Sequence, residues 1–67
     1  MVEVTINGDK RKLEPDLTIT DLLAILEMKS PAIAVEINHQ LQPRDTHDRT
    51  RIKSGDVLEI VTLVGGG

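Results

Sequence analysis

The sequence predicts a small α+β domain in which a single helix covers one face of a β-sheet. Segments at both ends of the chain alternate apolar and polar residues, and one segment between them has helical spacing. The order along the chain is strand, strand, helix, strand, strand, strand. With 67 residues there is material for one modest hydrophobic core, so we expect one domain in two layers.

The chain begins with a predicted β-hairpin. Residues 2–6 alternate apolar and polar side chains, as a strand with one buried face does. Asn7-Gly8 follows, and both residue types tolerate the positive φ that a type I′ turn requires. A two-residue turn would pair Val2 with Leu13, but it would also place Arg11 on the buried face. A longer loop is therefore the alternative.

A helix is predicted over residues 18–28. Pro15 ends the second strand, and Thr18 stands three residues before Asp21, which fits a capping box with Asp in place of Glu. Pro31 prevents the helix from continuing. A helix this short is marginal alone and must pack on the sheet. Its apolar stripe follows the i, i+3, i+4, i+7 spacing and consists of Ile19, Leu22, Leu23 and Leu26.

Two strands joined by a turn are predicted next. Residues 33–37 alternate in the same way as the first strand, and Asn38-His39 can turn the chain. Leu41 then lies in a short strand that Pro43 closes, as suits the edge of a sheet.

The last part of the chain combines a polar loop with the longest apolar-rich segment. Residues 44–51 are almost wholly polar and predict a surface loop with a single helical turn, which Ile52 pins to the core. After a turn at 53–56, residues 57–64 form the predicted central strand. Because Glu59 marks one face as solvated, we expect the helix to face Leu58 and Ile60, and the opposite face to carry Val57 and Val61.

The composition excludes several classes of function. There is no Cys, which excludes a disulfide scaffold, a Cys-ligated zinc module and a thiol nucleophile. There is no Phe, Tyr or Trp to form a stacking platform for nucleic acid, and the net charge of −3 disfavours polyanions. No apolar run approaches the roughly 20 residues of a membrane span, and the N-terminus lacks the pattern of a secretory signal. We therefore expect a cytoplasmic protein with no nucleic-acid or membrane partner.

The sequence contains no motif of a catalytic or metal site. His39 falls in a predicted turn and His47 in the polar loop, with no spacing that suggests a shared metal, so both are expected to be solvent-exposed. The carboxylates match no paired-acid motif, and no glycine-rich loop connects a strand to a helix. We expect a protein that is not an enzyme, with no catalytic residue, bound cofactor or metal.

Three glycines follow the last strand. Gly65, Gly66 and Gly67 cannot support a packed element, so we divide the chain into a folded domain over 1–64 and a flexible tail over 65–67. One interpretation of this tail is a frayed terminus or an added linker. The other is a slim arm that enters a narrow channel in a partner, where its terminal carboxylate becomes reactive once it forms an anhydride with AMP.

Several stretches, taken in order, match a known family. They are Val4-Thr5-Ile6-Asn7-Gly8, Thr18-Ile19-Thr20-Asp21-Leu22-Leu23, Ala34-Val35-Glu36-Ile37-Asn38, Pro43-Arg44, Lys53-Ser54-Gly55-Asp56-Val57-Leu58-Glu59-Ile60-Val61 and the terminal glycines. The chain thus resembles ubiquitin and the β-grasp sulfur carriers, most closely the ThiS family of thiamine biosynthesis, which is related to MoaD. The resemblance implies an α+β, ubiquitin-like β-grasp fold with a mixed sheet of four to five strands on one helix. One departure is His39, where the family usually has Gly after Asn.

The resemblance also implies a mechanism and a set of partners. In such carriers an E1-like, ThiF-like adenylyltransferase uses ATP to adenylate the terminal glycine, here Gly67, and Gly65 and Gly66 complete the arm. Sulfur from a donor such as a cysteine desulfurase then converts Gly67 to a thiocarboxylate, and a ThiG-like thiazole synthase receives it. Because this chain has no Cys, the sulfur must travel on the terminal acyl group.

A docking surface is expected on the face of the sheet away from the helix. Apolar side chains there have little left to pack on, and an exposed apolar patch commonly marks an interface. The alternative is that they pack under the 44–51 loop. The candidate residues are Val57, Val61, Leu63 and Val64.

Three other functions share part of this pattern. Sulfur carriers for molybdopterin, cysteine synthesis or tRNA thiolation share the fold and tail, although the absence of aromatic residues and the short 44–51 loop favour thiamine. A ubiquitin-like modifier would join Gly67 to a lysine. A simple binding module would have a passive tail.

Overall fold

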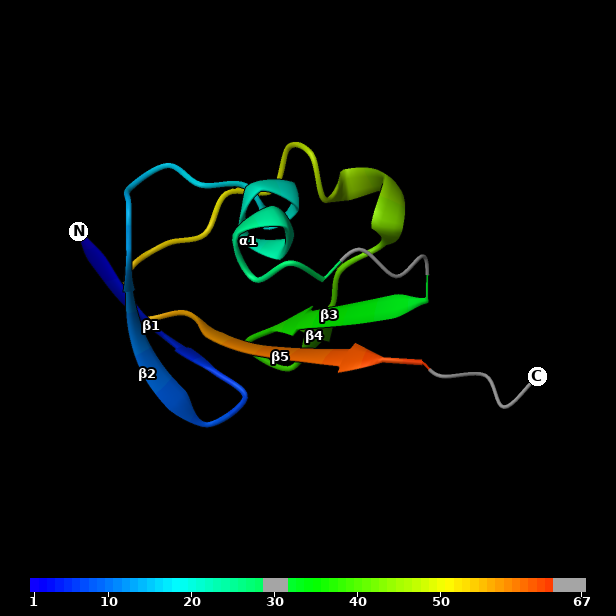
Figure 1. The fold of residues 1–67 in the computed structure, drawn as a ribbon, viewed down its shortest axis with the longest axis horizontal. Helices are drawn as coiled ribbons and strands as arrows, with labels where there is room; N and C mark the ends of the chain where they lie inside the picture. The colour runs from blue at the N-terminus through cyan, green and yellow to red at the C-terminus, as the bar shows by residue number, and fades with distance from the viewer. Residues whose placement is uncertain (29–31, 64–67) are drawn as a thin grey trace.

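Five strands form one mixed sheet, and one helix lies across one of its faces (Figure 1). The computed structural model describes residues 1–28 and 32–63. The sheet order is β2-β1-β5-β3-β4, so β5 occupies the centre, parallel to β1 and antiparallel to β3. This arrangement confirms the predicted β-grasp fold. The elements are β1 (Val2–Ile6), β2 (Asp9–Leu13), α1 (Ile19–Ile25), β3 (Ile33–Ile37), β4 (Gln40–Leu41), the 3₁₀ turn η1 (Arg44–Thr46) and β5 (Val57–Thr62).

The β1–β2 hairpin has the two-residue turn. Asn7 and Gly8 have φ values of 50° and 88°, and Val2 pairs with Leu13 in the predicted register. Arg11 therefore lies on the same face as Val4, its partner across the hairpin. The pairing is tolerated because β2 is an edge strand, where the Arg11 side chain stays exposed to solvent.

The start of α1 has the predicted capping box. The Asp21 N–H donates to Thr18 Oγ1 at 3.1 Å, and the Thr18 N–H donates to Asp21 Oδ2 at 3.0 Å. The hydrogen bond from the Thr18 N–H, helped by the Thr18 side chain, lowers the pKa of Asp21 from its ordinary value.

The end of α1 comes earlier than the predicted residue 28. Glu27 adopts a φ of 58°, and its N–H donates to the Ala24 carbonyl at 3.1 Å. The Met28 N–H reaches back to the Leu23 carbonyl at 2.9 Å, which completes a Schellman motif. This motif usually has Gly at the left-handed position. The sequence has Glu there, so no residue type in this segment predicted the end of the helix at this point.

The hydrophobic core lies between α1 and the sheet. The helix contributes Ile19 and Leu22, both fully buried, and the central strand contributes Leu58 and Ile60. Ile52 is 3% exposed and pins its loop as predicted, with its N–H donating to the Leu17 carbonyl at 2.8 Å. The other buried members are Val4, Ile6, Leu13, Val35 and Ile37.

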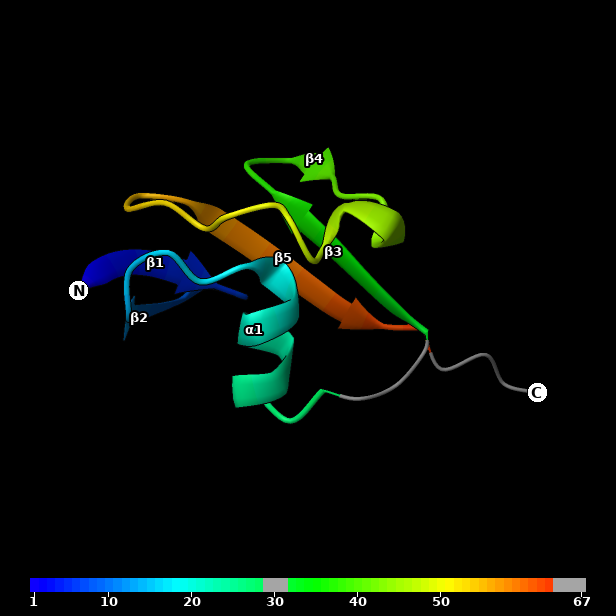
Figure 2. The same ribbon diagram turned by 90° about the horizontal axis from the view of Figure 1, so that it is seen from above.

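The 44–51 segment is less exposed than its polar composition predicts. Its helical turn is confirmed as η1, but His47 is 7% exposed, so the prediction of a solvated histidine at this position is wrong. His47 Nε2–H donates to the Gln42 carbonyl at 2.9 Å, and its own carbonyl accepts the Thr20 N–H at 3.1 Å. These two bonds hold the segment on the α1 side of the sheet, where Figure 2 shows it beside the helix.

The central strand ends two residues before the predicted boundary at 64. β5 stops at Thr62, and the Leu63 N–H still donates to the Ala32 carbonyl at 2.6 Å. Val64 and the predicted tail at 65–67 lie outside the described residues, as does Pro31. Among the described helices, none has the length and apolar character needed to cross a membrane.

Candidate functional site

The path of β5 decides where the C-terminal segment leaves the domain. This strand crosses the middle of the sheet with neighbours on both sides, and its last described hydrogen bond is made by Leu63. The described chain therefore ends directly after a strand that is paired with β1 on one side and with β3 on the other. The residues predicted from the sequence to form the reactive arm, Gly65, Gly66 and Gly67, all lie outside the described residues.

Asn7 holds β5 at a point that β1 does not reach. The β1–β5 ladder ends at the pair Ile6–Leu58, and the Asn7 N–H donates to the Leu58 carbonyl at 3.0 Å. The Asn7 side-chain amide continues the ladder in place of backbone groups. Its Nδ2 donates to the Ile60 carbonyl at 3.0 Å, and its Oδ1 accepts the Ile60 N–H at 2.8 Å. The sequence indicated Asn7 only as a turn residue, since the contact joins positions at opposite ends of the chain.

Asn38 performs a similar role at the start of β5. Its N–H donates to the Val57 carbonyl at 2.8 Å, and its Oδ1 accepts the Val57 N–H at 2.9 Å. Its Nδ2 also donates to Asp56 Oδ1 at 3.1 Å. An asparagine from each of two turns thus fixes the central strand from either side.

Replacing Asn7 with glycine should test this role without straining the turn. Asn7→Gly permits the same positive φ but removes both amide bonds to Ile60, so we expect a loss of about 1–3 kcal/mol in the free energy of unfolding. Hydrogen exchange of the Ile60 N–H should accelerate more than that of Leu58. Unchanged protection at Ile60 would show that the amide does not hold the strand.

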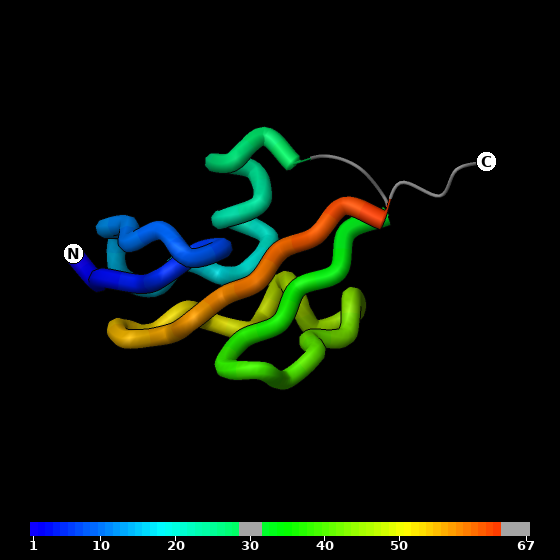
Figure 3. The backbone as a smooth tube through the Cα atoms, turned by 90° about the horizontal axis from the view of Figure 1, so that it is seen from below, coloured from blue at the N-terminus to red at the C-terminus, as the bar shows by residue number. Residues whose placement is uncertain are grey.

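The face of the sheet opposite α1, here called the open face, carries the predicted apolar residues. In the view of Figure 3, β5 and β3 lie in front of α1 and of the 44–51 segment. Val57, Val61 and Leu63 are 40%, 53% and 57% exposed, so they do not pack under the 44–51 loop. Val64 lies outside the described residues, and docking on this face stays a prediction.

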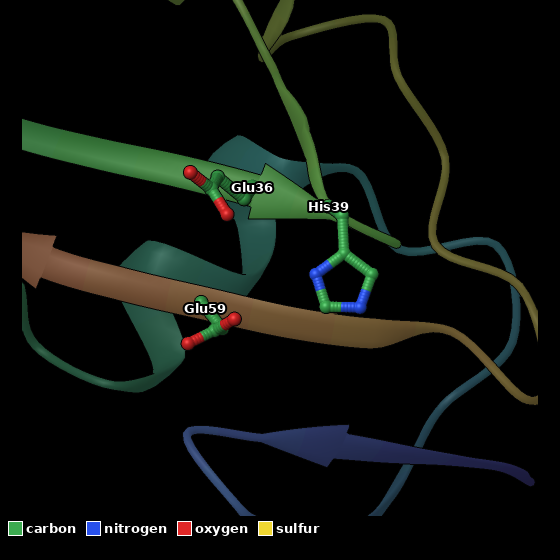
Figure 4. A group of neighbouring side chains, drawn as sticks. All are labelled: Glu36, His39 and Glu59. Carbon is green, nitrogen blue, oxygen red and sulfur yellow. The ribbon is translucent and has the colours of Figure 1, made fainter.

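Two carboxylates and an imidazole also meet on the open face. Glu36 of β3 lies directly across from Glu59 of β5, and His39 follows in the turn after β3 (Figure 4). Their ligand atoms all lie within 4.8 Å of one another. The sequence indicates His39 only as an exposed turn residue, and no local pattern predicts the cluster, because strand pairing brings the two glutamates together.

The comparison with known proteins points to one family. Residues 4–67 match the sequence model of the ThiS family. The chain belongs to the ThiS family. It is 35% identical over 63 residues to the sulfur carrier protein ThiS of Bacillus subtilis, covering 92% of this chain and 96% of that protein.

A second relative and a solved structure are also similar to this chain. A thiazole synthase of Paramagnetospirillum magneticum is 35% identical over 66 residues, which cover 98% of this ThiS-family chain but 20% of that protein. The crystal structure of a thiamine biosynthesis protein (ThiS) from Geobacter metallireducens superposes with a TM-score of 0.85 at 30% identity. That match covers 98% of this chain and 100% of the Geobacter chain.

Proposed function

We propose that this ThiS-family protein carries sulfur for thiazole formation in thiamine biosynthesis, on a thiocarboxylate at Gly67. The observation that carries the proposal is the family match, which runs from residue 4 through Gly67 and so includes the glycine tail. The role of the Bacillus subtilis relative, a sulfur carrier protein, supports it. In this proposal the chain is a co-substrate, and it holds no cofactor of its own.

The chemistry requires activation because a free carboxylate is a poor electrophile. A carboxylate oxygen of Gly67 attacks the α-phosphorus of ATP and pyrophosphate leaves, which produces an acyl adenylate. A sulfur nucleophile at the oxidation level of sulfide then attacks the acyl carbon, and AMP leaves. Glycines suit this arm because the absence of Cβ atoms allows it to pass through a narrow channel, where hydrogen bonds to the partner offset its ordering.

Two enzymes would act on the arm. An E1-like adenylyltransferase of the ThiF kind uses the ATP, and a thiazole synthase of the ThiG kind accepts the sulfur, which a donor such as a cysteine desulfurase supplies. The thiazole synthase of Paramagnetospirillum magneticum supports the second assignment, since a part of it is similar to nearly this whole chain. We place this ATP-dependent reaction in the cytoplasm.

The open face is the proposed docking surface for these enzymes. Val57, Val61 and Leu63 present exposed apolar side chains on the strand that leads to the tail. A partner that covers them would remove apolar surface from water and would orient the arm toward its active site.

Intact-mass measurement tests the proposed chemistry. After incubation with ATP, a ThiF-like adenylyltransferase and a sulfide source, the protein should gain the mass difference between sulfur and oxygen at one site. Fragmentation should place the sulfur on Gly67. An unchanged mass contradicts the proposal, and a ladder of conjugates to lysines would indicate a modifier instead. A thiocarboxylate that thiazole synthase does not consume would assign the carrier to another sulfur pathway.

A charge on the open face tests the docking surface separately. Val61→Asp should leave stability nearly unchanged because the side chain is 53% exposed, yet it should weaken binding to the adenylyltransferase by about tenfold or more. Thr20→Asp on the exposed side of α1 is the matched control. Equal binding by both variants would place the interface elsewhere.

A further inference from the structure

The three-residue cluster on the open face has the composition of a metal site. Glu36, His39 and Glu59 offer two carboxylates and one imidazole, with all ligand atoms within 4.8 Å of one another. Figure 4 shows the side chains gathered on one side of the β3 and β5 ribbons. Nothing in the sulfur-carrier function proposed above uses this cluster.

Strand pairing fixes the two glutamates. The hydrogen bonds from the Leu63 N–H to Ala32 and from the Asn38 N–H to Val57 mark the hydrogen-bonded rungs of the β3–β5 ladder. Because such rungs alternate along an antiparallel pair, Glu36 and Glu59 form one of them, with Cα atoms about 5.5 Å apart.

The turn after β3 fixes the histidine. Asn38 donates to the Val57 carbonyl and to Asp56 Oδ1 and accepts from the Val57 N–H, which ties this turn to the start of β5, so the next residue stands beside β5. His39 itself has a φ of 68°, a backbone conformation that glycine adopts more easily. An imidazole is thereby held next to two carboxylates at a position where a smaller residue would suit the backbone better.

The electrostatics of the cluster favour a bound cation. Like charges directly opposite on neighbouring strands repel each other. Within residues 1–28 and 32–63, no hydrogen bond or ion pair engages the side chains of Glu36, His39 or Glu59. A divalent cation among them would cancel the repulsion between the two carboxylates.

The donor types select the class of metal. Carboxylates alone suit Mg²⁺ or Ca²⁺, whereas imidazole together with carboxylate suits Zn²⁺ and similar transition metals. Zn²⁺ holds such ligands at about 2.0–2.2 Å, so donors up to 4.8 Å apart need to converge by only about an ångström. Exposed glutamate side chains with no other partner can make that movement by rotation. A fourth position stays open to water.

We propose that Glu36, His39 and Glu59 form a binding site for a divalent transition metal of the Zn²⁺ class. The site lies beside the exposed Val57 and Val61, so a bound divalent cation would neutralise the two carboxylate charges at the proposed docking surface.

Zinc titration of the full chain, followed by NMR and calorimetry, tests this site. The protein has two histidines, so the ring signals of His39 should shift on saturation with Zn²⁺ while those of the buried His47 stay in place. Mg²⁺ at the same concentration should shift neither. Absence of saturable Zn²⁺ binding, or an equal shift at His47, overturns the proposal.

Variants test whether Zn²⁺ binds at this site or at other exposed carboxylates. His39→Gly should retain the turn, because glycine suits its positive φ, and should weaken Zn²⁺ binding at least about tenfold, as should Glu59→Gln. Glu3→Gln removes an exposed carboxylate from β1 and should leave the affinity unchanged. Wild-type affinity in His39→Gly would overturn the site. Sulfur loading in the mass assay does not depend on Zn²⁺, so failure here leaves the proposed function untouched.

Discussion

A chain that lacks Gly67 is expected to fold like the full chain and to lose sulfur loading almost completely. Deletion moves the terminal carboxylate back by one residue, about 3.3–3.6 Å along an extended chain. A misplacement of about 1 Å at a reacting centre can already cost a hundredfold in rate. The initial rate of thiocarboxylate formation, followed by intact mass, should therefore fall by at least about a hundredfold.

The folded part provides the control for this deletion. The last described hydrogen bond of the central strand joins Leu63 to Ala32, ahead of the deleted residue, so the thermal unfolding midpoint should not change. Gly66→Val keeps the full length but adds a branched side chain to the arm, and it too should fold normally and load slowly. Loading of the shortened chain at the full rate would mean that the arm is not the reactive part.

Truncation of Leu58 to alanine is expected to have the largest effect on stability. Leu58, the second residue of β5, is fully buried in the core that α1 covers, and Leu→Ala changes in such positions cost about 2–5 kcal/mol. A domain of this size has a total stability of only about 3–10 kcal/mol. Urea unfolding of Leu58→Ala should therefore show a midpoint far below that of the wild-type protein, with part of the chain unfolded in water.

Two neighbouring substitutions make this result specific. Val57→Ala on the open face removes a side chain that is 40% exposed, and it should cost less than about 1 kcal/mol. Leu58→Met keeps the volume of the core and should cost less than about 1.5 kcal/mol. Equal losses at positions 57 and 58 would contradict the assignment of the two faces of β5.

Local signals predicted the elements whose causes are themselves local. Asn7-Gly8 specified a type I′ turn because both residues accept positive φ, and the turn then set the register of the hairpin. Thr18 and Asp21 marked the start of the helix because each side chain bonds a backbone N–H of the other. The alternation in β5 correctly separated the face with Leu58 from the face with Val57.

The errors concern residues that adopt a conformation or an environment that is unusual for their type. Glu27 ends the helix in a left-handed conformation that is usually adopted by glycine, so its position was not predicted as a helix end. His47 lies in a polar stretch, and only the packing of η1 against the α1 side of the sheet buries its ring. For His47 the surrounding structure overrides the preference of the individual residue.

The sequence by itself determined the fold class, the family and the glycine tail, because periodicity, turn residues and motif order act over short distances along the chain. Only the tertiary structure decided that Asn7 clamps the central strand at Ile60, and that Glu36 and Glu59 meet beside His39. Sheet pairing creates these contacts between positions far apart in sequence, and a single sequence does not encode such pairing in any local pattern.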